Sequence, residues 1–160
     1  MSISQRLRDL LDHAGVKYTV VPHAPAYTAE ETALRLHAPV REIAKAVVVR
    51  VDARLAVAVL PAPLRIDLER LGTALKARVE IASERETAEA FPDCEVGAMP
   101  PFGALYGLRT WVDESLTRDR EIVFNAGTHS EAIRMSFEDY RRLAAPILMW
   151  FAGEPARAGG

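Results

Sequence analysis

Two apolar stretches in succession decide the fold: Ala46-Val-Val-Val-Arg-Val51 and Arg54-Leu-Ala-Val-Ala-Val-Leu60, joined by Asp52-Ala53. Both are rich in the residues typical of strands, and the two-residue connection predicts an antiparallel hairpin. Neither stretch alternates apolar with polar residues. We therefore expect both faces of the hairpin to be covered, by helices or by a second layer of sheet.

Shorter elements are expected on both sides of the hairpin. Helix start signals occur at Ser2 or Ser4, Thr28 with Glu31, Asp67, Ser83 with Glu86, and Ser136. Further strands are expected at residues 17–21, 77–82, 109–113, 121–125 and 131–135. Strand and helix do not alternate regularly, so the pattern predicts the α+β class with a mixed sheet.

Length and composition bound the organisation of the chain. With 160 residues, 49% hydrophobic and 26% charged, the chain has the profile of one globular domain rather than of a disordered segment. We expect that domain over residues 1–152 and a disordered Gly/Ala-rich tail over residues 153–160. No apolar run approaches the length of about 20 residues that a membrane span needs, and residues 1–12 lack the apolar core of a signal peptide. We therefore expect a cytoplasmic protein with no membrane segment.

Cysteine, histidine and charge limit the kinds of site. The single cysteine excludes a disulfide within the chain, and the four scattered histidines lack metal-site spacing, so neither a metal nor another cofactor is expected. The net charge of −2 divides into +3 over residues 1–80 (12 basic, 9 acidic) and −5 over residues 81–160 (8 basic, 13 acidic). This argues against a broad nucleic-acid-coating surface but permits a small one-sided contact with a phosphate chain; a chance fluctuation explains it equally well.

Lys45 is the first candidate for chemistry. The chain has 17 arginines and only three lysines, and one of the three opens the most apolar strand. A partly desolvated ammonium group suits a point charge that holds an anion or a polarised carbonyl, or an amine with a lowered pKa. A lysine that snorkels at the edge of the strand fits the same position.

The stretch Gly97-Ala-Met-Pro-Pro101, followed by Phe102-Gly103, is the second candidate. A glycine and adjacent prolines fix an irregular turn whose backbone N–H groups could meet an oxyanion or a ribose hydroxyl. Because prolines cannot donate, the expected donors are Gly97, Ala98, Met99, Phe102 and Gly103. An ordinary rigid surface loop is the alternative.

The third candidate is Asn125-Ala-Gly-Thr-His129, a strand that runs into a Gly-Thr-His turn. A histidine at such a turn suits general acid–base catalysis or a hydrogen bond to a substrate ester, and the turn glycine permits close approach. A histidine satisfied by the neighbouring backbone is the alternative.

Cys94 lies in the same loop as Gly97 but is a poor nucleophile. Asp93 and Glu95 flank it, and adjacent carboxylates raise the pKa of a thiol and suppress its thiolate. We expect a structural or substrate-lining cysteine.

The order of six short motifs resembles the YbaK and prolyl-tRNA-synthetase-associated editing-domain family. The motifs are Tyr27-Thr-Ala-Glu30, Ala44-Lys45 before the Val-rich strand, Leu60-Pro-Ala62, Phe91-Pro-Asp-Cys-Glu95, Gly97-x-x-x-Pro101 and Ala126-Gly-Thr-His129, and the likeness spans roughly residues 7–151. This resemblance implies an α+β fold with a mixed, strongly curved β-sheet flanked by helices.

The same resemblance implies a metal-independent trans-editing hydrolase that frees a wrongly attached amino acid from tRNA, with water as the attacking group. In the family, the lysine matching Lys45 is essential, the loop matching Gly97–Pro101 shapes the pocket, and the histidine matching His129 lies beside it. The catalytic residues implied are therefore Lys45, Gly97, Pro101 and His129. The substrate-binding residues implied are His23, Tyr27, Ala98, Met99, Pro100, Phe102, Gly127 and Thr128.

The implied partner is the acceptor end of an aminoacyl-tRNA. Lys45 would grip it together with Arg41, Arg50 or Arg65, so few phosphates would be neutralised and binding would be weak. Delivery by a prolyl-tRNA synthetase or an elongation factor would compensate for that weakness.

The expected substrate is tRNA for proline carrying alanine, because Met99 and Phe102 would narrow the pocket; cysteine, serine and threonine remain open, since one methylene changes binding by only about 1–3 kcal/mol. Two other functions fit the sequence. One is a non-catalytic module that binds a nucleotide or an amino acid, and the other is an interaction protein that docks on a synthetase.

Overall fold

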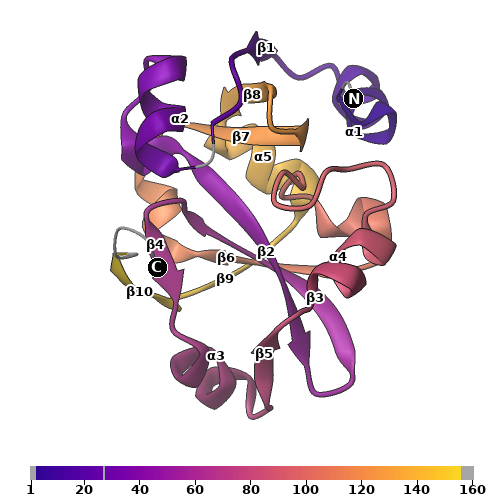
Figure 1. Cartoon of the computed structure of the whole chain (residues 1–160), viewed down its shortest axis with the longest axis vertical. Coiled ribbons are helices and arrows are strands. Elements are labelled where there is room, and N and C mark those ends of the chain that lie inside the picture. The colour runs from indigo at the N-terminus through magenta and orange to yellow at the C-terminus, as the bar shows by residue number, and fades with distance from the viewer. Residues whose placement is uncertain (1–2, 27, 156–160) are drawn as a thin grey trace.

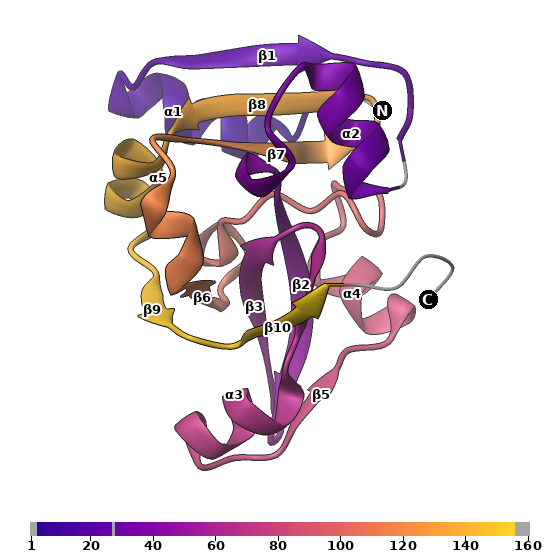
Figure 2. The same ribbon diagram turned by 90° about the vertical axis from the view of Figure 1, so that its left-hand side faces the viewer.

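The computed structural model describes residues 3–26 and 28–155 (Figures 1 and 2). The expected hairpin is its longest feature: β2 (Ala44–Val51) pairs antiparallel with β3 (Arg54–Pro61) over their full lengths, with Lys45 opposite Leu60. The tight turn is possible because Asp52 adopts a positive φ of 53°. Its carboxylate and amide are both bonded to the backbone of Arg78.

The hairpin is the centre of a five-stranded sheet with the order β5-β2-β3-β6-β9. β5 (Val79–Ile81) is antiparallel to β2, whereas β6 (Arg109–Asp113) is parallel to β3 and β9 (Ile147–Met149) is parallel to β6. The sheet is therefore mixed, as the sequence predicts.

Two further sheets accompany the central one, a three-stranded sheet and a two-stranded sheet that includes the end of the chain. β1 (Tyr18–Pro22), β8 (Glu131–Ser136) and β7 (Glu121–Thr128) form an antiparallel sheet in that order. A parallel bridge between Ile43 and Val123 joins β7 to the chain just before β2. Figure 2 shows this sheet at one end of the molecule and α3 with β5 at the other, with the hairpin running between them.

The helices are α1 (Gln5–Ala14), α2 (Ala29–Leu36), α3 (Leu68–Leu75), α4 (Glu84–Ala90) and α5 (Phe137–Ala144). Short 3₁₀ helices span Val40–Glu42, Gly103–Tyr106 and Glu114–Arg118. Four of the five helices begin at a side chain that accepts a hydrogen bond from the backbone N–H three residues later: Thr28, Asp67, Ser83 and Ser136. Ser4 stands at the start of α1 but makes no capping bond; its hydroxyl is used elsewhere.

Apolar cores cover both faces of the hairpin, which confirms the prediction from its lack of alternation. On one face, Val48 and Val59 pack with Phe124 of β7, Leu7 of α1 and Tyr140 of α5. The other face carries a core of Val49, Leu60, Leu71, Trp111 and Phe151. β3 is buried from Ala56 to Pro61, but Lys45 and Val47 of β2 stay half-exposed, so the cover has a gap beside them.

The end of the chain corrects the expected tail. Ala152–Pro155 form β10, which pairs antiparallel with β4 (Leu64–Ile66), so disorder from residue 153 is wrong for residues 153–155. Buried Asp113 fixes this segment, because its Oδ1 accepts hydrogen bonds from the amides of Phe151 (2.7 Å) and Ala152 (2.8 Å). The sequence analysis assigns no strand to β4, β9 or β10, although residues 147–152 form an apolar run of strand length.

No helix within the described ranges is long and apolar enough to cross a membrane.

Candidate functional site

Lys45 lies on the face of β2 that also carries Val47 and Val49, opposite Leu60 of β3. The side chain is half-buried, and burial, followed by the nearby charge of Arg65, lowers the pKa of its ammonium group. None of residues 3–26 and 28–155 forms a hydrogen bond or an ion pair with it. The sequence thus predicted a partly desolvated lysine, and the structure adds that no described carboxylate neutralises it.

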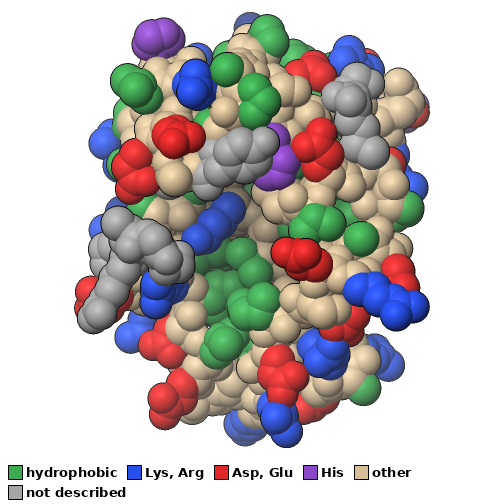
Figure 3. All heavy atoms as spheres, in the orientation of Figure 1, with side chains coloured by type: hydrophobic (Ala, Val, Ile, Leu, Met, Phe, Trp, Pro, Cys, Tyr) green, Lys and Arg blue, Asp and Glu red, His purple; other side chains and the backbone are tan. Residues whose placement is uncertain are grey.

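The surface over β2 and β3 is hollowed. Figure 3 shows hydrophobic side chains on the floor of this hollow and a Lys or Arg side chain above them. A His side chain lies at its upper edge, and Asp or Glu side chains lie on the surrounding rim. Such a surface suits a ligand that presents an apolar part together with a negative or polarised oxygen.

The loop at Gly97 and the turn at Gly127-Thr-His129 lie against each other, as expected. The amide of Glu95 donates to the carbonyl of Gly127, and the amide of Gly127 donates to the carbonyl of Ala98, both at 2.8 Å. Nε2 of His129 donates to the carbonyl of Val96 at 3.0 Å. Three bonds therefore join two segments about thirty residues apart, in the manner of a short strand pair.

The two glycines are required at this junction. Gly97 has a φ of +90° and Gly127 a φ of +101°, a region that side chains disfavour. A Cβ on Gly97 would also lie 3.3 Å from Cε1 of His129, which is a tight contact, whereas one on Gly127 would be in ordinary contact with Sγ of Cys94 at 3.5 Å. Gly97 therefore permits close approach to His129, and Gly127 is required for its backbone conformation.

The expected row of free backbone donors is wrong at four of its five positions. The amide of Gly97 contacts Sδ of Met99 at 3.1 Å, and that of Ala98 donates to the carbonyl of Glu95. Phe102 donates to Pro100, and Gly103 donates to the hydroxyl of Thr110. Met99 is the position whose amide has no acceptor among the described residues. Three of these acceptors lie in the loop itself and Thr110 supplies the fourth, as expected for backbone groups that are largely buried.

The second half of the loop is buried rather than exposed. Pro100 and Pro101 are buried, and the hydroxyl of Tyr140 donates to the carbonyl of Pro101 at 2.6 Å. Phe102 is 1% exposed and meets Phe124 and Tyr140 edge-on, with ring centroids 5.8 and 5.1 Å apart. The structure thus places Phe102 in the core, where it anchors the loop and offers no surface to a substrate.

His129 fixes the loop in place. A carbonyl oxygen can only accept, so the bond to Val96 keeps a proton on Nε2 of the ring. The amide of His129 also approaches Oε2 of Glu95, at 3.4 Å. This geometry favours the expected alternative, a histidine bonded to the neighbouring backbone, over a general base acting through Nε2.

His23 lies beside this turn. Its amide donates to the carbonyl of Ser130 at 2.9 Å, and Nδ1 donates to the carbonyl of Ala24 at 2.8 Å. Nε2 is buried without a hydrogen-bond partner in the described part of the chain. Thr128 is 1% exposed, and its hydroxyl is bonded to Ser130. Tyr27, the remaining expected binding residue, lies outside the described residues.

Asn125 is a polar residue that the sequence reasoning did not single out. It follows the apolar run Ile122-Val-Phe124 in strand β7, and its Oδ1 is buried with no partner among residues 3–26 and 28–155. Val123 of β7 forms a parallel bridge with Ile43, just before β2. Asn125 and Lys45 each lie two residues beyond this bridge, on chain segments that run in the same direction. In the sequence, the signal that could have identified Asn125 is an amide side chain directly after apolar strand residues.

The site offers no evident metal position. Within the described ranges, no group of three or more His, Cys, Asp or Glu side chains is placed to hold a metal ion. The features on which a site can be proposed are a lysine without a described counter-charge, a hollow with an apolar floor, and a rigid loop locked to a histidine turn.

Comparison with known proteins agrees with this combination. The model of the aminoacyl-tRNA editing domain family matches residues 23–143. The multifunctional Ser/Thr-tRNA deacylase ProXp-y of Escherichia coli K12 is 32% identical over 153 residues, which cover 92% of this chain and 91% of that protein. The ProXp-y of E. coli O157:H7 matches to the same extent.

A solved structure described as that of a candidate trans-editing enzyme for prolyl-tRNA synthetase has the same fold. Its TM-score is 0.81 at 22% identity, and the match covers 96% of this chain and all of that one (100%). The fold, the matched residues and the relatives lead to one conclusion: the chain belongs to the aminoacyl-tRNA editing domain family.

Proposed function

We propose that this protein is a deacylase that hydrolyses the ester between a wrongly attached amino acid and tRNA. Its membership of the editing family and its 32% identity to a Ser/Thr-tRNA deacylase support the reaction class. The observation that carries the proposal in this chain is Lys45, a half-buried cation on the central hairpin with no described counter-charge.

The chemistry needs no strong nucleophile on the protein. Water attacks the carbonyl carbon of the ester, and the carbonyl oxygen becomes negative in the tetrahedral intermediate. The C–O bond to the terminal ribose then breaks; the amino acid leaves as a carboxylic acid that loses its proton to solvent, and the ribose oxygen regains a hydroxyl proton. A fixed positive charge beside the developing oxyanion stabilises the transition state more than the neutral ester.

Lys45 supplies that charge in our proposal. Its backbone is fixed in a strand of the central sheet, which limits where the ammonium group can lie. The loop Gly97–Pro101, locked by His129, forms the wall of the pocket. Cys94 takes no covalent part, since burial, with a lesser contribution from Asp93, raises the pKa of its thiol to about 12.

We propose serine or threonine as the amino acid removed. The name of the ProXp-y relative supports this choice, whereas the expectation of alanine loses its support: Phe102 lies in the core, and Sδ of Met99 contacts the amide of Gly97. A hydroxyl-bearing side chain would also supply the donor that Oδ1 of Asn125, on the strand bridged to Ile43, lacks among the described residues.

The test is deacylation of a panel of esters. Ala, Cys, Ser and Thr are attached to tRNA for proline and, in parallel, to their own tRNAs, and the rate of amino-acid release is measured with wild type and Lys45→Ala. Removing one oxyanion-stabilising group is expected to lower kcat about 100- to 1,000-fold. Lys17→Ala is the matched control, because Lys17 is exposed between α1 and β1.

Each outcome is decisive for one part of the proposal. Release of Ser or Thr that Lys45→Ala abolishes supports both reaction and substrate. Release of Ala or Cys alone overturns the choice of amino acid. Survival of every ester at high protein concentration overturns catalysis and favours the non-catalytic binding module, which equilibrium binding of the same tRNAs would then reveal.

A further inference from the structure

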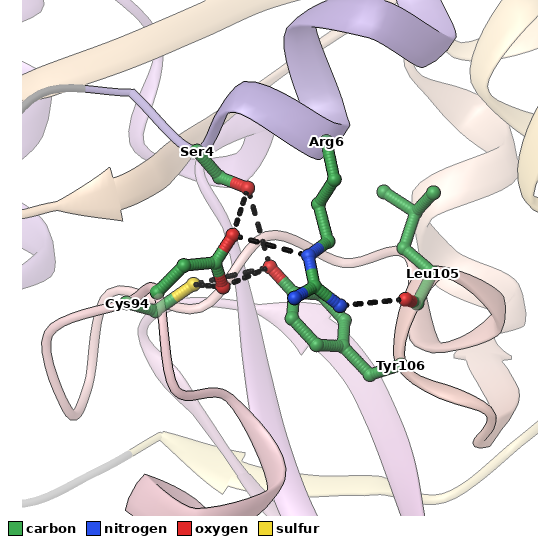
Figure 4. A network of polar contacts seen from close by, with 6 residues as sticks. Ser4, Arg6, Cys94, Leu105 and Tyr106 are labelled. Atoms are coloured by element: carbon green, nitrogen blue, oxygen red, sulfur yellow. Dashed lines mark hydrogen bonds and ion pairs between the residues drawn. The ribbon is translucent and has the colours of Figure 1, made fainter.

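A cluster of polar side chains lies directly before the Gly97 loop (Figure 4). We call it the Asp93 cluster; it consists of Ser4, Arg6, Asp93, Cys94 and Tyr106. Oδ2 of Asp93 accepts from the hydroxyl of Ser4 at 2.6 Å and lies 3.2 Å from Nε of Arg6. Its Oδ1 accepts from the hydroxyl of Tyr106 at 2.8 Å and from the thiol of Cys94 at 3.4 Å.

The carboxylate of Asp93 is the centre of this cluster because Ser4, Cys94 and Tyr106 donate to it and Arg6 forms an ion pair with it. Burial by itself would raise its pKa, but the hydrogen bonds from Ser4, Tyr106 and Cys94 and the charge of Arg6 lower the pKa overall. Asp93 therefore stays ionised. Such charge-assisted bonds are stronger than bonds between neutral groups.

The cluster ties the N-terminal segment to the loop. Ser4 uses its hydroxyl on Asp93 instead of capping α1, and its amide donates to the carbonyl of Ala126 at 3.0 Å. The guanidinium of Arg6 stacks 4.6 Å from the ring centroid of Tyr106 and donates to the carbonyl of Leu105 at 3.1 Å. Ser4 and Arg6 both precede residue 23, where the match to the family model begins.

The Asp93 cluster also lies next to the junction between the Gly97 loop and the turn at Gly127. A Cβ on Gly127 would lie 3.4 Å from the amide nitrogen of Ser4 and 3.5 Å from Sγ of Cys94. The next residue after the cluster, Glu95, is bonded to Gly127 through its amide. A displacement of Asp93 would therefore reach Val96, Gly97 and the bond to His129 within a few residues.

We propose that Asp93 is a positioning residue for the site: with Ser4 and Arg6 it holds the Gly97 loop against β7, so that the N-terminal segment completes the pocket wall. The inference rests on the deacylase function proposed above. Asp93 acts through the loop and touches no reacting atom.

The chain contains its own reporter for this role. Cys94 is the only cysteine, it is 9% exposed, and its thiol is bonded within the cluster. Iodoacetamide should label it slowly in the wild type, because the buried thiol stays protonated, and faster in any variant that lets the loop open.

The experiment compares Asp93→Asn and Arg6→Gln with wild type and with Arg85→Gln. Arg85 forms a more exposed ion pair, with Glu89 on α4, and serves as the control for the loss of one paired arginine charge. Three quantities are measured for each: kcat and KM for the best ester of the panel, the rate of Cys94 labelling, and the midpoint of urea unfolding. Arg6→Lys, which keeps the charge beside Asp93, tests for rescue.

We expect both cluster variants to lower kcat about tenfold or more with KM changed less than about threefold, because a misplaced loop impairs transition-state geometry. Cys94 labelling should accelerate about tenfold, Arg6→Lys should restore part of kcat, and Arg85→Gln should match wild type. Arg6→Gln is the milder change, since its side chain is 43% exposed, and it keeps the test valid if Asp93→Asn unfolds.

Two results would overturn the inference. Variants that label faster but keep the wild-type kcat would show that the loop opens without consequence for the site. A loss of kcat that merely follows the unfolded fraction in urea would show a general stabilising role. If wild type itself releases no amino acid, the deacylase function has failed, and the positioning role fails with it; Cys94 labelling then still reports whether the cluster holds the loop.

Discussion

Two constraints, one on the backbone conformation and one on space, require glycine at position 97. Its φ of +90° disfavours any side chain, and a Cβ there would press on the ring of His129 at 3.3 Å. We expect Gly97→Ala to lose about 1–2 kcal/mol of unfolding free energy through the backbone. Because the contact also displaces the His129 bond to Val96, deacylation should fall about tenfold or more. Urea unfolding and ester release measure the two effects.

Gly107→Ala separates the two constraints. Gly107 also has a positive φ, of 72°, but nothing lies within 4 Å of a Cβ placed there. It should therefore lose a similar unfolding free energy and keep its activity. Equal losses of activity in the two variants would mean that backbone strain, and not the contact with His129, is responsible.

At the residue scale, the sequence predicts the chemical character of a residue better than its solvent accessibility. Lys45 could be singled out because a rare lysine opens the most apolar strand, and the meeting of the Gly97 loop with His129 was implied by the family resemblance. The burial of Phe102 could not be predicted, because it packs against Phe124 and Tyr140, which are distant in sequence. The loop amides find acceptors mostly within the loop, at Glu95, Met99 and Pro100, but only in a turn geometry that the sequence does not specify.

At the scale of elements, helix starts were readable and the last strands were not. Caps are local, so Thr28, Asp67, Ser83 and Ser136 predict their helices from three neighbouring residues. β9 and β10 are short; β9 pairs with β6, and a buried carboxylate on β6 binds the chain where β10 begins. Asp113 is 1% exposed and accepts from the amides of Phe151 and Ala152, far along the chain.

Asp113→Asn should therefore release the C-terminal strand. The NH2 group of asparagine would take the place of one carboxylate oxygen. In either orientation of the amide it would face N–H donors instead of accepting hydrogen bonds from them. Leaving buried donors unsatisfied costs about 1–3 kcal/mol each, so we expect a loss of a few kcal/mol in unfolding free energy. Hydrogen exchange should accelerate first at Phe151 and Ala152. Unchanged exchange there would show that β10 is held by its pairing with β4 alone, and Glu89→Gln, on an exposed pair, is the control.

At the scale of the whole molecule, the distribution of charge decides how tRNA could be gripped. The net charge of −2 leaves little general attraction for a polyanion, so a few unpaired cations must supply it. Of the three arginines expected to assist Lys45, Arg41 lies 3.5 Å from Asp119, and Arg50 is paired with Glu80 and Glu86. Arg65 is exposed, acts electrostatically on Lys45, and forms no ion pair within the described part of the chain.

Arg65 is therefore the residue that we expect to contact a phosphate of the acceptor end. Arg65→Gln should raise KM for the aminoacyl-tRNA several-fold at low salt and leave kcat close to wild type, since phosphate contacts position a nucleic acid without taking part in the chemistry. Losing one contact with a single-stranded phosphate should also reduce the slope of log KM against log salt concentration by about 0.7. Arg41→Gln is the matched comparison: its charge is already partly neutralised by Asp119, so its effect on KM and on the slope should be smaller. Equal effects of the two substitutions would place the tRNA across a wider face of the molecule, and a fall in kcat with Arg65→Gln would place Arg65 beside Lys45 at the ester itself.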